Sequence, residues 1–271
     1  MTTQLLNQEM IDLLASHFQV RREPQFALNA AISQFLAIPG LVGFWPMSSV
    51  QRSTGNVYDV SGQNRILTYR GNPTYNYYNN LVPYVDLDGV GDYVDRADET
   101  DLDILGTETI FPAAIRGLTY VGWYWLNNPA ALATQVPMFK GTNAAGTFAY
   151  WLTKLNTGPD MAFRVSVDGT AVTSVTSTVS LVANTWYFIA GRFIPSTSLD
   201  IYINTTLTSN AVAIPASIFN SAQPFAIGGI GGASPGVYLP GRASFCALSA
   251  NALSDTCILN LYNSTRTMFG V

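Results

Sequence analysis

Hydrophobic and polar positions alternate most clearly between residues 184 and 204, which read NTWYFIAGRFIPSTSLDIYIN. The half from 186 to 191 is apolar at nearly every position, which suits a strand buried on one or both faces. In the half from 199 to 204, every second residue is aliphatic, so one side of a strand lies in a core and the other in water. The residues expected on the water side are Asp200, Tyr202 and Asn204. Because Pro195 and its serine and threonine neighbours supply turn chemistry, this stretch predicts a β-hairpin.

Short apolar runs of the same period continue from Leu41 almost to the end of the chain. Residues 118–126, LTYVGWYWL, are apolar or aromatic almost throughout and predict a central strand covered on both faces. The pair Asp168-Gly169 between two alternating runs predicts a tight hairpin turn. Residues 72–80, NPTYNYYNN, are expected to form a loop, and Ser254 to cap a final helix over 255–262. Many short strands with regular turns indicate a sandwich or a closed barrel.

The segment from residue 3 to residue 38 follows a different, helical period. Its first apolar stripe consists of Leu5, Leu6, Met10, Leu13, Leu14 and Phe18. A second stripe follows Pro24 and consists of Leu28, Ala31, Ile32, Phe35 and Leu36. Two short amphipathic helices must bury these stripes, either on the β domain or against copies of themselves. The segment is therefore either an appendage on the domain's own surface or an assembly and anchoring segment.

Five blocks of sequence, in order, carry a resemblance to a known fold family. They are GLVGFWPM at 40–47, VYDVSGQN at 57–64, LDGVGDYVD at 87–95, the hairpin at 184–204, and FAIGG through NLYN at 225–263. Together they resemble the laminin-G-like, concanavalin A-like jelly roll. The resemblance implies a mainly β, two-sheet antiparallel jelly-roll sandwich over 40–271. The N-terminal pair of helices, assigned to an assembly or anchoring segment at 1–39, lies outside the resemblance. The closing strand departs from the family, because Ala243, Ser244 and Cys246 stand where acidic residues are usual.

Composition limits the classes of partner. Charged residues make up only 11% of the 271 residues, against about 25% in an ordinary globular protein. Because a surface poor in charge is a solubility liability, this favours a homo-oligomer or burial by other subunits. With a net charge of −4 and no basic run, direct nucleic-acid binding is not expected. No apolar run approaches the roughly 18 residues of a membrane span, and no secretory signal is visible at the N-terminus.

A dense set of acidic residues between Asp86 and Asp103 suggests two kinds of site. The resemblance implies that hydrolases of this fold carry a Glu-x-Asp-x-x-Glu or Glu-x-Asp-x-Glu strand, and residues 99–103, ETDLD, approach it but end in aspartate. A solvated acidic loop is the favoured interpretation of that stretch. Hard oxygen ligands also suit Ca²⁺, so Asp88 and Asp92 are the candidate metal ligands, and calcium is the one cofactor expected, if any.

Sugar binding is the third chemistry that the sequence suggests. Exposed aromatic rings beside amide side chains form platforms and hydrogen-bond partners for saccharides. The candidate carbohydrate-binding residues are Tyr75, Tyr77, Tyr78 and Asn79. The competing interpretation is that these tyrosines pack against a neighbouring subunit, where tyrosine is also enriched.

The two cysteines, Cys246 and Cys257, are expected to be buried thiols rather than a disulfide. A zinc site is not expected, because the chain has a single histidine and no CxxC motif. The single histidine also makes a Ser-His-Asp triad improbable.

The sequence as a whole favours a non-enzymatic structural or interaction protein. We expect a virion or other particle component, such as a capsid decoration, fibre or tail protein, made in the host cytoplasm and contacting other particle proteins. The alternative is a carbohydrate-binding module, with or without the assistance of calcium. A glycoside hydrolase is the third interpretation.

Overall fold

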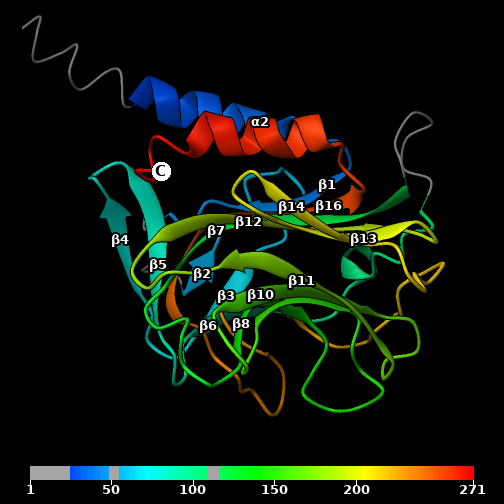
Figure 1. Ribbon diagram of the computed structural model, residues 1–271. Helices are drawn as coiled ribbons and strands as arrows, with labels where there is room; N and C mark the ends of the chain where they lie inside the picture. The colour runs from blue at the N-terminus through cyan, green and yellow to red at the C-terminus, as the bar shows by residue number, and fades with distance from the viewer. Residues whose placement is uncertain (1–24, 49–54, 109–115) are drawn as a thin grey trace, which may run out of the picture.

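The computed structural model describes residues 25–48, 55–108 and 116–271. Two eight-stranded antiparallel sheets pack face to face, and helices cover the outer face of one of them (Figure 1). This arrangement confirms the predicted fold class, a mainly β two-sheet sandwich with helices.

Sheet A runs β14-β13-β12-β7-β16-β5-β4, with β1 paired to β16. Its strands are β14 (Thr206–Asn210), β13 (Ser198–Ile203), β12 (Trp186–Ile194), β7 (Arg116–Leu126), β16 (Pro240–Asn251), β5 (Val82–Asp88), β4 (Thr74–Tyr78) and β1 (Leu41–Trp45). Sheet B runs β11-β10-β9-β8-β15-β6-β3-β2. Its strands are β11 (Val172–Ser180), β10 (Asp160–Ser166), β9 (Tyr150–Lys154), β8 (Gln135–Lys140), β15 (Phe225–Ile227), β6 (Tyr93–Arg96), β3 (Leu67–Arg70) and β2 (Asn56–Val57).

The predicted hairpin is the pair β12–β13, and the predicted central strand is β7, which lies between β12 and β16. Both predictions are confirmed, and so is the Asp168-Gly169 turn, which joins β10 to β11 with Gly169 at a positive φ of 83°. The prediction of a loop over 72–80 is wrong, because residues 74–78 form the edge strand β4. Cross-strand pairing with β5 imposes an extended backbone that the Tyr/Asn composition does not reveal.

Two residues expected in water are instead buried. Asp200 and Tyr202 are each 1% exposed. The guanidinium of Arg192, directly opposite Asp200 on β12, forms an ion pair of 2.7 Å with the Asp200 carboxylate. The Tyr202 hydroxyl donates to Asp255 at 2.7 Å. Because these polar atoms all have partners, a further layer can cover this face of the sheet.

That further layer consists of two helices that lie side by side on sheet A (Figure 1). Residues 25–36 are helical, and Phe35 stacks on Phe44 of β1 with ring centroids 4.8 Å apart. This confirms the second predicted helix and shows its stripe packed on the domain's own sheet, except for Leu36, which is 44% exposed. The first predicted helix lies outside the described residues, so the assembly or anchoring role of residues 1–39 stays a prediction.

The second helix of this layer is α2 (Asp255–Thr265), and the Ser254 side chain caps it by accepting from the Cys257 N–H at 3.2 Å, as predicted. The chain then turns back, and Phe269 stacks on Trp123 of β7 at 4.1 Å. The Trp123 indole N–H donates to Thr265 at 2.9 Å. This layer therefore buries a second aromatic core, separate from the core between the sheets.

Both cysteines are free thiols rather than a disulfide, as predicted, but the expected burial is found only at Cys246. Cys246 is buried between the sheets, and burial raises its pKa to about 11. Cys257 is only partly buried, on α2. Within the described residues, no helix is both long and apolar enough to span a membrane.

Replacing Phe269 with alanine should destabilise the fold by about 3–5 kcal/mol, the usual cost of removing a buried phenylalanine. The loss follows from the stacking of this ring on Trp123 and its edge contact with Trp186 at 4.9 Å. Phe26→Ala is the control, because Phe26 is 66% exposed and should change the free energy of unfolding by less than about 0.5 kcal/mol. Urea unfolding followed by tryptophan fluorescence measures both. Equal effects of the two variants would contradict the packing described here.

Candidate functional site

One row of side chains crosses the outer face of sheet A near the ends of its strands. Each member lies directly opposite the next in strand register, so all share one face of the sheet. The row, from the edge strand inward, is Thr74, Asp86, Arg242, Trp125 and Trp186. We call these five residues the ledge.

The ledge emerges gradually from beneath the helix layer. Trp186 is 1% exposed, under Phe269. The side chains of Arg242 and Asp86 are 26% and 35% exposed, and Thr74 at the edge is open to solvent. The helix layer therefore covers the aromatic end of the row and leaves its polar end accessible.

Arg242 lies between two aromatic rings. Its guanidinium carbon is 4.9 Å from the centroid of Tyr84 and 4.9 Å from that of Trp125. Cation–π contacts of this kind contribute about 0.5–2 kcal/mol each and fix the plane of the guanidinium. Its Nε lies 3.4 Å from Asp86, a long contact that leaves the carboxylate free for other donors. The glycine at 241 permits this geometry, because a Cβ there would clash with the Trp125 carbonyl oxygen.

Beside the ledge lies a cleft of about 640 Å³. Its polar lining comes from Asn72, Thr74, Asp86, Asp88, Asp92 and Asn127. These residues reach the cleft from β4, from β5 and the turn after it, and from the end of β7. The cleft is thus assembled from three separate parts of the chain and is continuous with the exposed end of the ledge.

Asp88 and Asp92, the candidate metal ligands, form one wall of this cleft. Oδ1 of Asp88 accepts the N–H groups of Val90, Gly91 and Asp92 at 2.7, 3.0 and 3.1 Å. Burial raises the Asp88 pKa, but these backbone donors outweigh it and hold the pKa below the ordinary value. Asp92 accepts from the N–H of Asn72 at 2.7 Å. The Asp88 carboxylate therefore fixes the β5–β6 turn, and the Asp92 carboxylate holds that turn against the chain entering β4.

No group of three or more histidine, cysteine or acidic side chains in the described part of the chain is arranged to hold a metal. Calcium binding at Asp88 and Asp92 stays a prediction.

The structure divides the candidate carbohydrate-binding residues between the two faces of β4. Tyr75 points between the sheets, where its ring is 4.7 Å from that of Tyr69. Tyr78 points to the helix side and contacts Trp186 at 5.9 Å. Tyr77 is 40% exposed, and Asn79 is in the turn at a positive φ of 51°. The four residues therefore do not form one platform, and Tyr77 is the most exposed of the three tyrosines.

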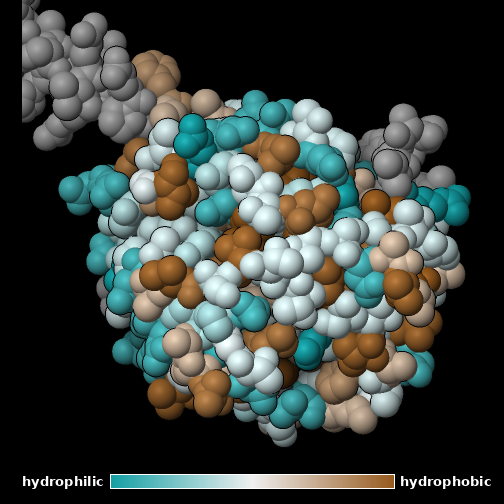
Figure 2. Space-filling model, viewed as in Figure 1, coloured by the Kyte–Doolittle hydropathy of each residue, from teal (hydrophilic) through white to brown (hydrophobic). Residues whose placement is uncertain are grey.

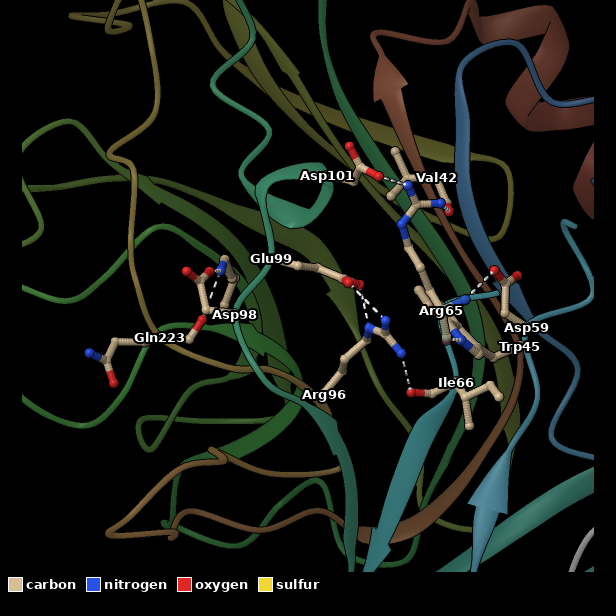
Figure 3. Close-up of polar contacts among 11 residues, drawn as sticks. Val42, Trp45, Asp59, Arg65, Ile66, Arg96, Asp98, Glu99, Asp101 and Gln223 are labelled. Carbon is tan, nitrogen blue, oxygen red and sulfur yellow. Dashed lines mark hydrogen bonds and ion pairs between the residues drawn. The ribbon is translucent and has the colours of Figure 1, made fainter. Parts of the chain in front are cut away.

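The acidic residues of the stretch 99–103, which resembles a hydrolase motif in sequence, form ion pairs with basic side chains (Figure 3). Glu99 is paired with Arg96, whose Nη2 donates at 2.8 Å, and Asp101 with Arg65. Asp103 is paired with Lys140 at 3.1 Å. These ion pairs favour a structural role for the stretch, which forms the short 3-10 helix η2 (Thr100–Leu102) and its flanks.

Comparison with known proteins identifies the family. A laminin G-type family model, described as the concanavalin A-like lectin/glucanases superfamily, matches residues 111–258, more than half of the chain. The chain belongs to this superfamily. No curated protein matches it.

Several solved structures share the fold of this superfamily member. The receptor-binding domain of a botulinum neurotoxin C/D mosaic serotype is 11% identical, with a TM-score of 0.61, and the match covers 83% of this chain and 51% of that one. The binding domain of botulinum neurotoxin DC, solved in complex with rat synaptotagmin II, is 14% identical, with a TM-score of 0.60 and coverages of 83% and 52%. The binding domain of Paraclostridial mosquitocidal protein 1 is 13% identical, with a TM-score of 0.63 and coverages of 83% and 52%. The chain thus spans about half the length of these matches.

Sequence reasoning missed most of the ledge. Arg242 falls within the fifth block of the resemblance, and Trp125 within a strand expected to be covered on both faces. The available signal was position, because Trp125 is the last residue but one of its strand and two asparagines follow that strand directly.

The lowered pKa of Asp88 allows a test of whether the hydrogen bonds to its carboxylate stabilise the fold. A carboxyl whose folded pKa is lowered stabilises the fold above its unfolded pKa, and this stability is lost as pH falls through the folded value. Asp88→Asn should therefore lower the urea midpoint most at neutral pH, and the gap to the wild type should close in the acid range, at and below the ordinary aspartate pKa of 3.8. Urea titrations across that range measure it, and parallel curves for the two proteins would contradict it.

Proposed function

We propose that this chain is a non-catalytic binding domain that takes a saccharide in the cleft beside the ledge. The observation that carries the proposal is the convergence of Asp86, Asn127 and Thr74 on one cleft next to the immobilised guanidinium of Arg242. A carboxylate, an amide, a hydroxyl and a guanidinium supply both acceptors and donors, which neighbouring sugar hydroxyls need.

The comparisons support a binding role in general terms. The superfamily description includes both lectins and glucanases, and the three solved structures compared above are receptor-binding or binding domains. One of them was solved in complex with rat synaptotagmin II, and a further similar structure with SialylT. These ligands belong to those proteins. For this chain, the ion-paired acidic stretch favours binding over hydrolysis.

A glycan array followed by calorimetry tests the proposal. Asp86→Ala and Asn127→Ala should each weaken binding about 10- to 100-fold, the effect of losing hydrogen bonds to a ligand in which charged or amide groups take part. Asn128→Ala is the matched control, because Asn128 is the exposed neighbour of Asn127 and does not line the cleft.

Circular dichroism would confirm that the variants fold. Binding that survives both cleft substitutions but is abolished by Tyr77→Ala would move the site to the tyrosines of β4. No binding to any glycan would overturn the proposal.

The second candidate function, a component of a virion or other particle, is favoured by the low charge content of 11%. Figure 2 shows a face on which residues of near-neutral hydropathy surround separate hydrophobic patches. Val172 on β11 and Leu207 on β14 are 45% and 41% exposed, on edge strands that lie close together. Such a surface suits contact with further subunits.

If the chain is a particle component, the purified protein should form a homo-oligomer. Light scattering coupled to size-exclusion chromatography should give a mass that is a multiple of 29.3 kDa. Charged substitutions at Val172 and Leu207 should reduce the oligomer. A monomer at all concentrations would count against the particle role and leave the saccharide proposal standing.

A further inference from the structure

Lys140, at the end of β8, is a completely buried lysine held by two carboxylates. Its side chain is 0% exposed. Nζ donates to Oδ1 of Asp98 and to the carbonyl oxygen of Gln223, at 2.7 Å for the latter. Oδ1 of Asp103 lies 3.1 Å from the same nitrogen. A primary amine is thus held against two carboxyl groups out of contact with solvent, close to the ion pairs shown in Figure 3.

The strands hold these groups in place. Phe225 of β15 lies opposite both Lys140 on β8 and Arg96 on β6, so the chain that leaves β6 passes over Lys140. Asp98 follows two residues after Arg96. The 3-10 helix η2 then brings back Asp103, and its buried Leu102 accepts a hydrogen bond from the Tyr150 hydroxyl at 2.8 Å. Reacting groups held in this manner reach effective concentrations of about 10⁵–10⁸ M.

The two carboxyl groups have different surroundings. The Asp98 side chain is 31% exposed and that of Asp103 only 11%. Burial raises the pKa of Asp103, Lys140 opposes this, and the contact with the Asp98 carboxyl raises it further. Both carboxyl groups approach the same nitrogen, Nζ of Lys140. A protonated Asp103 can therefore donate to a carboxyl oxygen of Asp98 and make its carbon more electrophilic.

We propose that Lys140 and Asp98 join in an intramolecular isopeptide bond, with Asp103 as the proton carrier. Transfer of one proton from the ammonium to the carboxyl pair leaves a neutral amine. Nζ then attacks Cγ of Asp98, the C–N bond forms and one Cγ–O bond breaks. Asp103 passes the proton lost by nitrogen to the departing hydroxyl, which leaves as water. No electron is gained or lost, and no co-reactant is needed.

A second buried lysine shows what is particular to this site. Lys154 on β9 is also 0% exposed, but its Nζ donates to the carbonyl oxygen of Ala131. Among the described residues, no carboxylate forms an ion pair with it. A peptide carbonyl has no hydroxyl to lose as water, so the same burial at Lys154 leads to no bond.

The bond would fasten the segment that leaves β6 to the end of β8. It replaces a buried ion pair, whose desolvation is costly, by a neutral amide. As with a disulfide, it would also restrict the unfolded chain and so favour the folded state.

Mass spectrometry of the full-length protein tests the proposal. Under denaturing conditions the intact mass should be lower than the sequence mass by one water molecule. A tryptic digest should contain a branched peptide that joins the segments of Lys140 and Asp98, while Lys154 should occur only in linear peptides. Lys140→Arg, Asp98→Ala and Asp103→Asn should each restore the full sequence mass, and circular dichroism should show that they fold.

Lys140→Arg also separates the bond from cyclisation at Asp88-Gly89 or Asp168-Gly169, which would remove the same mass. A wild-type protein with the full sequence mass overturns the proposal, and so does a deficit that persists in Lys140→Arg. A bond that still forms in Asp103→Asn overturns the role given to Asp103.

Discussion

The outer face of sheet A cannot be left in water, and this constraint shapes the rest of the molecule. Strand β7 places Trp123 and Val121 on that face, and the hairpin partner β12 adds Trp186 and Phe188, all at most 1% exposed. At about 25 cal/mol for each square ångström of apolar surface, exposing several large aromatic side chains would cost several kcal/mol. A third layer is therefore required, and the helix at 25–36 together with α2 and the chain after it supplies it. The ledge exists because this layer stops before the end of the sheet.

Much of this architecture could be predicted from the sequence, because period-two alternation and turn residues act locally. The hairpin at β12–β13, the central position of β7, and the cap at Ser254 all follow from such local signals. The burial of Asp200 could not be predicted in this way. The alternation of residues 199–204 indicates that Asp200 lies on a polar face. Only the strand register, which places Arg192 opposite Asp200, shows that the charge is neutralised and can be covered.

The candidate site was less predictable for the same reason. Thr74, Asp86, Trp125 and Arg242 are distant in sequence and meet only because four strands align in one register. Alternation fixes which face a residue occupies, but it does not fix which residue of another strand lies opposite. The tyrosines of β4 show the converse. They are neighbours in sequence, and the pleat of the strand separates them onto different faces.

The arginines near the two ends of β16 make different kinds of contact. Near its last residues the chain is fastened, because Arg65 donates to the carbonyl of Val42 in the adjacent β1 and pairs with Asp101. Near its first residues, Arg242 is fixed by stacking between two aromatic rings. Its ion pair with Asp86 is long, and the Asp86 side chain is more than a third exposed. Seven residues of strand, or about 23 Å, separate Arg242 from Ser249. The first residues of β16 thus present a guanidinium held in a fixed plane beside a carboxylate that other donors can still reach.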